Sequence, residues 1–359
     1  MKQWEKNIRK VVPYVPGEQP NKKDMIKLNT NENPYPPAPG VERVLREFNA
    51  DMLRLYPDPT VSLLVEELAG SYGLNHDQVF VGVGSDDVLA MAFLTFFNAG
   101  KRLLFPDITY SFYPVWCDLY RIPYETQPLD DNFRIIKEDY YKENGGIVIA
   151  NPNAPTSIYE ELSVVEDIIR HNQDSIVIID EAYVDFGGSS AVQLIPKYEN
   201  LLVVQTFSKS RSMAGMRIGY GMGNPVLVKA LNDVKYSFNS YTMNQTAILA
   251  GVEAVRDARY FGDCRNKIIK TRERAEDALR ELGFTFLQSG ANFLFAAHES
   301  IPAKEIFEAL RNNNIYVRYF NLPRINNFLR ITIGTDEEMD RLFAFLRQFT
   351  EKYSKNEKF

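Results

Sequence analysis

Several apolar stretches of the chain are followed closely by residues that could do chemistry. Asp180 comes straight after the apolar run 176–179, and Lys209 comes four residues after the run 201–205. A lysine amine can join an aldehyde covalently, and a carboxylate can keep a ring nitrogen protonated. Each residue alone is weak evidence, because a lysine at such a place is usually a solvated surface group and an aspartate is often a helix cap.

A turn of small residues follows the apolar run 79–83 and leads into a helical pattern. Ser85 and Asp86 stand at the start of that helix, where N–H groups and the helix dipole favour a phosphate. A GxG pair ends at Gly84, but Asp87 occupies the place of the third glycine of a dinucleotide fingerprint. The turn therefore predicts a site for one phosphate rather than for a dinucleotide.

The acidic pair Asp180 and Glu181 has a competing interpretation as the magnesium-binding strand of an ATPase. That interpretation needs a GxxxxGK phosphate loop followed by Ser or Thr, and the sequence contains none. The histidines show no metal-ligand spacing either. We therefore expect no metal centre. The three histidines are His76, His171 and His298.

We expect the polar residues that follow the apolar runs to meet, because ligands of α/β sheets bind at the carboxyl ends of the strands. Together they would supply a phosphate site, a carboxylate, a lysine and the arginine Arg217. Pyridoxal 5'-phosphate (PLP) needs that set: donors and a cation for its phosphate, a carboxylate for its ring nitrogen and an amine for its aldehyde. The combination predicts a PLP site.

The elements that position this site follow from the hydrophobic pattern. Short apolar runs alternate with helical patterns, one of which opens with a capping box at Ser163 and Glu166. The alternation predicts an α/β domain with a mostly parallel sheet between helices. The expected strands are 79–83, 102–105, 147–150, 176–179, 201–205 and 217–220.

The character of the sequence changes twice along the chain. The first part is rich in Pro and Asn, which predicts an extended arm lying over another surface. After about residue 244 a helical pattern runs to Leu282 and stops at Gly283, and short strand-like pieces lead to a last helix capped by Thr335 and Glu338. We expect an N-terminal arm (1–40), a large α/β domain (41–245) and a smaller α+β domain (246–359).

Composition disfavours several classes of function. The 359 residues carry a net charge of −6 and a pI near 5.4, whereas a nucleic-acid partner needs a basic face. The longest apolar run, 88–97, is too short to span a membrane, and we see no secretory signal. The two cysteines, Cys117 and Cys264, are too few for a disulfide framework and fit a reducing cytoplasm.

The motifs resemble a known family. Over almost its whole length the chain is similar to fold-type I PLP-dependent enzymes, and within them to the histidinol-phosphate aminotransferase family of class II aminotransferases. Asp-Glu-Ala-Tyr at 180–183 and Ser-Lys at 208–209 are typical of PLP aminotransferases, while 31–35 and 56–58 favour the histidinol-phosphate branch. Further matching pieces are 28–30, 83–86, 109–110, 214–217 and 328–332.

The resemblance implies a role for each matching residue. Lys209 would carry PLP as a Schiff base and act as general base and acid, Asp180 would pair with the ring nitrogen, and Tyr183 would hydrogen-bond the phenolic oxygen. The ring would stack on Tyr110. A contact across subunits would make the protein a homodimer with shared sites. The implied phosphate contacts are Ser85, Asp86, Ser208, Arg217 and, from the neighbouring subunit, Tyr56.

The resemblance also implies substrate contacts. Arg330 would bind the carboxylate of glutamate or 2-oxoglutarate, and Arg318 and Arg330 together would bind the phosphate of histidinol phosphate, because a guanidinium offers planar, bidentate donors. Asn33 would be a further substrate contact. The implied reaction is transamination between L-histidinol phosphate and 2-oxoglutarate, giving imidazole acetol phosphate and glutamate in histidine biosynthesis.

One stretch departs from the family pattern. The family usually has Asn-Asn-Pro-Thr-Gly where residues 153–157 are Asn-Ala-Pro-Thr-Ser. The asparagine that normally holds the phenolic oxygen of PLP therefore matches Ala154. Asn153 is the expected substitute, and the alternatives are Asn151 or Tyr183 acting alone. A serine in place of the glycine also leaves the usual loop conformation open.

Other functions would use the same cofactor residues. An aromatic amino-acid aminotransferase and a threonine-phosphate decarboxylase of the cobalamin pathway both share them, although Arg318 with Arg330 favours a phosphorylated substrate. A PLP-dependent regulator would need a DNA-binding domain, and the sequence shows no basic segment of that kind.

Overall fold

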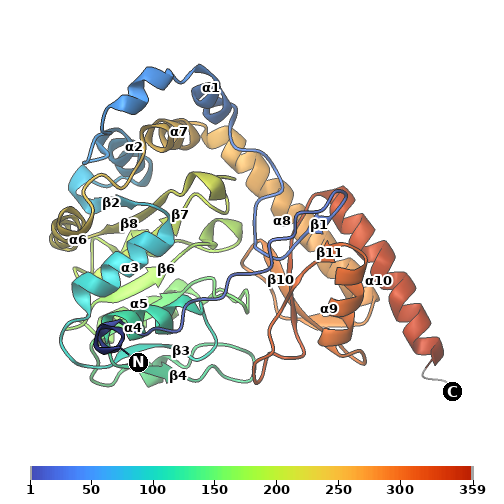
Figure 1. Cartoon of the computed structure of the whole chain (residues 1–359). Helices are drawn as coiled ribbons and strands as arrows, with labels where there is room; N and C mark the ends of the chain where they lie inside the picture. Colours follow the sequence, from blue (N-terminus) through green and yellow to red (C-terminus); the bar gives the residue numbers. More distant parts are fainter. Residues whose placement is uncertain (1, 357–359) are drawn as a thin grey trace.

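A seven-stranded sheet forms the centre of the large domain in the computed structural model, which describes residues 2–356 (Figure 1). The strand order is β2-β8-β7-β6-β5-β3-β4, and every neighbouring pair is parallel except the two that involve β8. The sheet is therefore mostly parallel, as predicted. Its strands are β2 (Val79–Gly82), β3 (Leu103–Pro106), β4 (Tyr124–Gln127), β5 (Gly146–Ala150), β6 (Val177–Asp180), β7 (Leu201–Thr206) and β8 (Gly219–Gly223).

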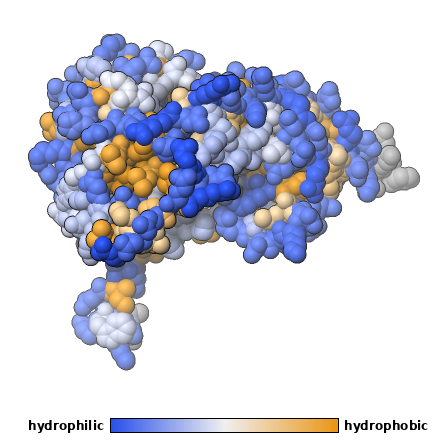
Figure 2. Space-filling model, turned by 90° about the horizontal axis from the view of Figure 1, so that it is seen from above, coloured by the Kyte–Doolittle hydropathy of each residue, from blue (hydrophilic) through white to orange (hydrophobic). Residues whose placement is uncertain are grey.

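The smaller domain is joined to the large one by the long helix α8 (Ala258–Glu281), and Figure 2 shows the two domains side by side. Its four-stranded sheet is antiparallel, in the order β12-β13-β10-β9. Among the described residues, no helix has the length and apolar character needed to cross a bilayer. The other elements are β9 (Phe284–Phe286), β10 (Phe293–His298), α9 (Ala303–Asn312), β11 (Ile315–Tyr316), β12 (Arg318–Tyr319), β13 (Leu329–Thr332) and α10 (Asp336–Asn356).

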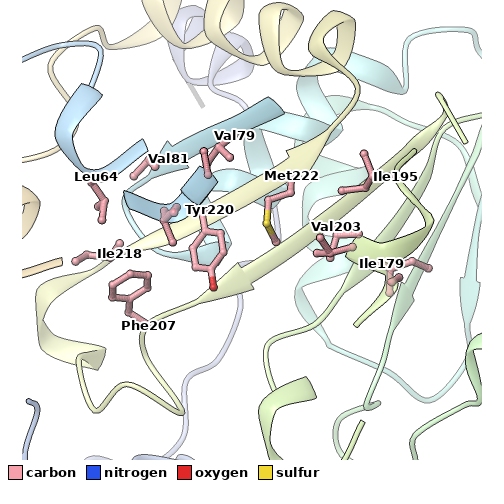
Figure 3. Packing of buried hydrophobic residues seen from close by; sticks show 14 of the residues in the cluster. Leu64, Val79, Val81, Ile179, Ile195, Val203, Phe207, Ile218, Tyr220 and Met222 are labelled. Atoms are coloured by element: carbon pink, nitrogen blue, oxygen red, sulfur yellow. The ribbon is translucent and has the colours of Figure 1, made fainter. Parts of the chain in front are cut away.

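Helices cover both faces of the large sheet, because its central strands carry apolar side chains on both sides. On one face Val203 and Tyr220 pack in the same cluster as Leu64 of α2 (Figure 3). On the other face Val204 packs in a cluster with α3, α4 and α6. The first face is covered by α1 (Pro39–Glu47), α2 (Ser62–Tyr72), α5 (Leu162–His171) and α7 (Gln245–Arg256), and the second by α3 (Ser85–Phe96), α4 (Phe112–Tyr120) and α6 (Pro225–Phe238).

The N-terminal segment passes along both domains before α1 begins at Pro39 (Figure 1). It is extended for most of its length, and its strand β1 (Ile26–Lys27) pairs in parallel with β11 of the small domain. Its beginning stands out from the body in Figure 2. Trp4, which lies in this part of the chain, is 59% exposed. The segment therefore contacts the small domain through its later residues.

Two differences from the expected elements have local causes. The helical pattern 244–282 is divided at Asp257, whose carboxylate accepts a hydrogen bond from the N–H of Tyr260 at 3.0 Å and so starts a new helix. Strand β8 begins at Gly219 rather than at Arg217, because Arg217 has a left-handed φ of 55° that a strand cannot contain.

The two expected capping boxes have different outcomes. The one at Thr335 and Glu338 is confirmed: the Thr335 N–H donates to Glu338 Oε2 at 2.8 Å, and the Glu338 N–H donates to Thr335 Oγ1 at 3.3 Å. The one at Ser163 is wrong, since α5 begins at Leu162 and Ser163 already lies inside its first turn.

Candidate active site

The central strands deliver an acid and an amine to the same edge of the sheet. β6 ends at Asp180, and the neighbouring parallel strand β7 leads into the loop that carries Lys209. Asp180 is 5% exposed, and Lys209 is half-buried. Both residues therefore lie at the carboxyl ends of adjacent strands, where ligands of α/β sheets bind.

Burial governs the charge of Asp180. Its desolvation raises the pKa of the carboxyl to about 6, from an ordinary value of 3.8. The Tyr113 hydroxyl donates to Oδ2 at 2.9 Å and the Ala182 N–H donates to Oδ1 at 3.3 Å, and both bonds oppose that rise. Because little water competes at such a site, the carboxylate would pair strongly with a cation placed against it. A protonated ring nitrogen is a cation of this kind.

The first turn of α3 offers a site for a phosphate. A Cβ built on Gly84 would lie 2.4 Å from Nη2 of Arg217, and one built on Gly219 would lie 2.2 Å from the nitrogen of Ser85. These two glycines therefore let a guanidinium and the start of β8 approach the end of the helix closely. The Ser208 hydroxyl lies 3.5 Å from Nη1 of Arg217. The site combines N–H donors, a hydroxyl and a cation.

Tyr110 stands beside this phosphate site. Its hydroxyl donates to Asp86 Oδ1 at 2.8 Å, and Asp86 Oδ2 lies 3.6 Å from Nη2 of Arg217. The Tyr110 ring meets the Tyr113 ring edge-on, with centroids 5.7 Å apart. Tyr14 of the N-terminal segment approaches Tyr110 with centroids 6.5 Å apart. The aromatic residues thus connect the phosphate site to Asp180.

Residues 29–33 are here called the bridging segment. Two of its main-chain carbonyls accept hydrogen bonds from cationic side chains of the site. The Asn29 carbonyl accepts from Nη2 of Arg330 at 2.9 Å, and the Thr30 carbonyl accepts from Nζ of Lys209 at 3.1 Å. The bridging segment therefore lies against both the lysine and the arginine that were expected to act on the substrate.

Asn33, expected as a substrate contact, supports the lysine loop. Its Nδ2 donates to the carbonyls of Lys209 at 3.1 Å and of Ser210 at 3.2 Å, and its Oδ1 accepts from the Tyr35 N–H at 3.0 Å. A substrate could reach this amide only by displacing those bonds.

Tyr183 lies between the lysine and the small domain. Its ring centre is 5.6 Å from Nζ of Lys209, and the Phe293 ring packs against it edge-on at 5.1 Å. Its hydroxyl accepts a hydrogen bond from Nδ2 of Asn31 at 2.9 Å. Ala154 is buried in an apolar cluster with Phe293 that packs against the Tyr183 ring.

The side-chain amides of the two asparagines considered for the phenolic oxygen already bond to other parts of the chain. Asn153 Nδ2 donates to the Ile108 carbonyl and to Thr156 Oγ1, both at 2.9 Å. Asn151 donates to the Glu160 carbonyl at 2.9 Å and accepts from the Glu160 N–H at 2.8 Å. Either asparagine could turn to a cofactor only if these bonds broke. The geometry therefore favours the third alternative, Tyr183.

Arg318 and Arg330 stand directly opposite each other on strands β12 and β13. Their guanidinium carbons lie 5.4 and 5.6 Å from the centre of the same Phe320 ring. Burial lowers the pKa of Arg330, and its buried Nε makes no hydrogen bond to the residues described. Two like charges held this close are unfavourable until an anion binds them, so the pair is suited to an anionic substrate.

Tyr56 points into solvent. Its side chain is 82% exposed, and its ring stacks on that of Tyr241 with centroids 4.6 Å apart. Its exposure leaves this hydroxyl accessible to a second chain.

Sequence reasoning missed Tyr113, Asn31 and Tyr14. Tyr113 lies three residues after Tyr110, and this helical spacing was a usable signal. The contact between Asn31 and Tyr183 joins residues 152 apart, so no local pattern could have shown it.

The donor set fits PLP. The buried carboxylate suits its ring nitrogen, the lysine amine its aldehyde, and the glycine-lined helix end with Arg217 its phosphate. These fits rest on groups supplied by separate elements of the chain, which meet at one edge of the sheet.

Comparisons with known proteins show which family the chain resembles. Residues 23–346 match the family model "Aminotransferase class I and II". A histidinol-phosphate aminotransferase of Brachyspira hyodysenteriae is 53% identical over 92% of this chain and 94% of its own length, and one of Lactococcus lactis subsp. cremoris is 50% identical over 98% and 99%. The solved histidinol-phosphate aminotransferase of Sinorhizobium meliloti, in complex with pyridoxal-5'-phosphate, has a TM-score of 0.83 at 24% identity over 91% of each chain, which shows a shared fold.

Proposed function

Because the chain belongs to the class I and II aminotransferases, we propose that it transfers the amino group of L-histidinol phosphate to 2-oxoglutarate with PLP as cofactor. The products are imidazole acetol phosphate and glutamate, in histidine biosynthesis. We place the enzyme in the cytoplasm, a choice supported by the two free, buried cysteines in the described chain, Cys117 and Cys264.

The observation that carries the choice of substrate is the arginine pair. Arg318 and Arg330 stand opposite each other on two antiparallel strands, and both guanidinium groups lie near the Phe320 ring. A phosphate dianion matches two guanidinium groups, and one of the two carboxylates of 2-oxoglutarate can use Arg330 when the second half of the reaction begins. The names of relatives about half identical to this chain support the same substrate.

The chain's own groups divide the chemistry between them. When bound, PLP supplies an aldehyde that exchanges amines and a ring that accepts electrons. Lys209 removes the Cα proton of the amino donor and later delivers a proton to Cα of the incoming 2-oxo acid, while the Thr30 carbonyl holds its amine in place. Asp180 keeps the ring nitrogen protonated, and Tyr183 holds the phenolic oxygen. Arg217 and Ser208 bind the phosphate.

A steady-state substrate panel on the purified protein tests the proposal. We expect kcat/KM for histidinol phosphate to exceed that for histidinol by about 100-fold or more, since each bond to a charged arginine contributes about 1.5–3 kcal/mol. The panel also contains phenylalanine, tyrosine and threonine phosphate. A higher kcat/KM for the aromatic amino acids, or carbon dioxide release from threonine phosphate, would replace the proposal by one of the alternative activities.

The assignment of Lys209 has a spectroscopic test. Lys209→Ala and the charge-preserving Lys209→Arg both lack the amine that joins the cofactor, so both are expected to lose the visible absorbance of the lysine-bound cofactor together with turnover. Retained turnover in either variant would show that another group carries the cofactor.

We further propose a homodimer in which Tyr56 reaches the cofactor phosphate of the neighbouring subunit. Support comes from the exposure of Tyr56 and from a series of exposed apolar side chains close to it in the sequence. The neighbouring exposed apolar residues are Leu45, Met52, Leu53, Leu55 and Leu63.

Mixing two inactive variants tests the shared site. If Tyr56 acts across the interface, a mixed dimer of Tyr56→Ala and Lys209→Ala contains one site with both residues intact. Activity should therefore return after subunit exchange, up to about half of the wild-type value per mixed dimer. Variants that remain as inactive together as apart, although exchange is complete, would place Tyr56 in its own subunit's site or outside it.

A further inference from the structure

The hydrogen bond between Asn31 and Tyr183 fixes which way the tyrosine hydroxyl points. A hydroxyl has one proton to donate and lone pairs to accept with. Asn31 Nδ2 donates to the Tyr183 oxygen at 2.9 Å, so the hydroxyl proton must be directed elsewhere. Ala154 and Phe293 form an apolar wall beside the ring, where a hydroxyl proton finds no acceptor in the described chain. The proton is therefore directed toward the site.

The orientation of the Asn31 amide follows from its other contacts. The Thr332 hydroxyl donates to Asn31 Oδ1 at 3.0 Å and accepts from the Asn31 N–H at 3.0 Å. Because the oxygen of the amide is used by Thr332, the nitrogen is the atom that faces Tyr183. Asn292 Nδ2 also donates to the Asn31 carbonyl at 3.1 Å. Asn31 is 1% exposed and has a left-handed φ of 56°, a conformation that asparagine tolerates better than most residues.

We infer that Asn31 is a positioning residue for the proposed transamination, which sets the Tyr183 hydroxyl as a donor to the phenolic oxygen of the cofactor. The inference rests on the proposed function. It also answers the question raised by Ala154, since the amides of Asn151 and Asn153 already donate to Glu160, Ile108 and Thr156. As Thr332 and Asn292 belong to the small domain, the direction of the hydroxyl depends on how that domain packs against the bridging segment.

A pH titration of the visible absorbance of the holoenzyme measures this effect without substrate. A bond from Tyr183 stabilises negative charge on the phenolic oxygen, so its loss lets the Lys209–cofactor linkage keep its proton to a higher pH. Tyr183→Phe is expected to raise the midpoint of the absorbance change by about one pH unit, as expected for one hydrogen bond to a charged group. Tyr183→Phe retains the two charged groups that lie near Tyr183, which are Lys209 and Arg330.

Two variants of Asn31 separate orientation from packing. Asn31→Asp keeps the shape but replaces the N–H donor by an acceptor, so the hydroxyl turns away. Its added negative charge also favours the protonated linkage, so the midpoint should rise by at least as much as in Tyr183→Phe. Asn31→Gly tolerates the left-handed backbone and should give a smaller rise in the same direction. In Asn31→Gly combined with Tyr183→Phe, the midpoint should equal that of Tyr183→Phe alone, because the asparagine acts only through the hydroxyl.

The matched control is Asn29→Ala. Its side chain donates to the Glu18 carbonyl at 2.7 Å, so this change disturbs the same segment without touching the tyrosine hydroxyl, and the midpoint should stay at the wild-type value. An unchanged midpoint in Asn31→Asp, a shift as large in Asn29→Ala, or shifts that simply add in the double variant would overturn the inference. A wild-type protein without the lysine-dependent visible absorbance would instead overturn the proposed function itself.

Discussion

Replacing Tyr113 with phenylalanine removes one hydroxyl from the surroundings of Asp180 and leaves the ring in place. Tyr113 is fully buried, and its hydroxyl donates to Asp180 Oδ2 at 2.9 Å. The carboxyl already has a raised pKa of about 6 because it is buried, and the tyrosine is the largest of the influences that oppose this rise. Without that donor, the carboxyl should hold its proton to a higher pH.

The size of the change follows from the bond that is lost. A hydrogen bond to a charged group contributes about 1.5–3 kcal/mol, and about 1.4 kcal/mol corresponds to one pKa unit. The pKa of Asp180 in the apoprotein should therefore rise by about one to two units, to between about 7 and 8. Near pH 7 the carboxyl must then lose its proton before it can pair with the ring nitrogen. That requirement should weaken PLP binding by about two- to tenfold.

The assay is a PLP titration of the apoprotein at about pH 7 and about pH 9, with the dissociation constant as the readout. The loss of affinity in Tyr113→Phe should shrink at the higher pH, where the carboxyl is ionised in both proteins. Tyr140→Phe is the matched control. Tyr140 is equally buried, but its hydroxyl has no hydrogen-bond partner among the residues described, so its removal should leave PLP binding unchanged.

Equal dissociation constants for wild type and Tyr113→Phe near pH 7 would refute the reasoning. So would a loss of affinity that is the same at both pH values, since a purely structural effect on the pocket does not follow the ionisation of Asp180. A loss of the same size in Tyr140→Phe would attribute the effect to packing.

Two further predictions concern charge. Arg318→Ala and Arg330→Ala should each raise KM for histidinol phosphate by about 10- to 100-fold, with the larger rise for Arg330 because it also holds the Asn29 carbonyl; steady-state kinetics with unchanged KM would contradict this. In the apoprotein, burial raises the pKa of Asp180 to about 6 and of Glu181 to about 7, from ordinary values of 3.8 and 4.5. Because the folded chain then binds more protons than the unfolded chain, its free energy of unfolding should fall as pH rises from about 4 to about 7 and level off above. Urea titrations across this pH range measure how the free energy of unfolding changes with pH. Glu181→Gln should make its fall less steep at the upper end of the range. A free energy of unfolding that rises with pH would contradict the prediction.

Much of the large domain could be predicted because its strands are marked by apolar runs of neighbouring residues. The strand β6 is an apolar run that ends at Asp180, and β7 is one that leads to Lys209. The place of each residue directly after an apolar run therefore predicted that it lies at the carboxyl edge of the sheet. The edge strand β4 escaped prediction. Its polar, partly exposed residues lack the apolar run that marks a covered strand.

The contacts that tune the site could not be predicted from spacing. Tyr113 and Asp180 are 67 residues apart, and their bond depends on how α4 packs against the sheet. The asparagines of the 151–153 loop were reasonable candidates by position, yet their amides donate to the main-chain carbonyls of Glu160 and Ile108. Which of several nearby amides faces a ligand is decided by tertiary packing, and a local pattern does not record it.

In the bridging segment, the Asn29 carbonyl accepts a hydrogen bond from Arg330 and the Thr30 carbonyl accepts one from Lys209. Every amino acid carries the same carbonyl, so exchanging the side chain at Thr30 leaves the acceptor for the lysine in place. An alanine at Thr30 would therefore make this position look more dispensable than its carbonyl is. Changes to the length of the segment, which slide both oxygens away from their cations at once, should reveal its importance.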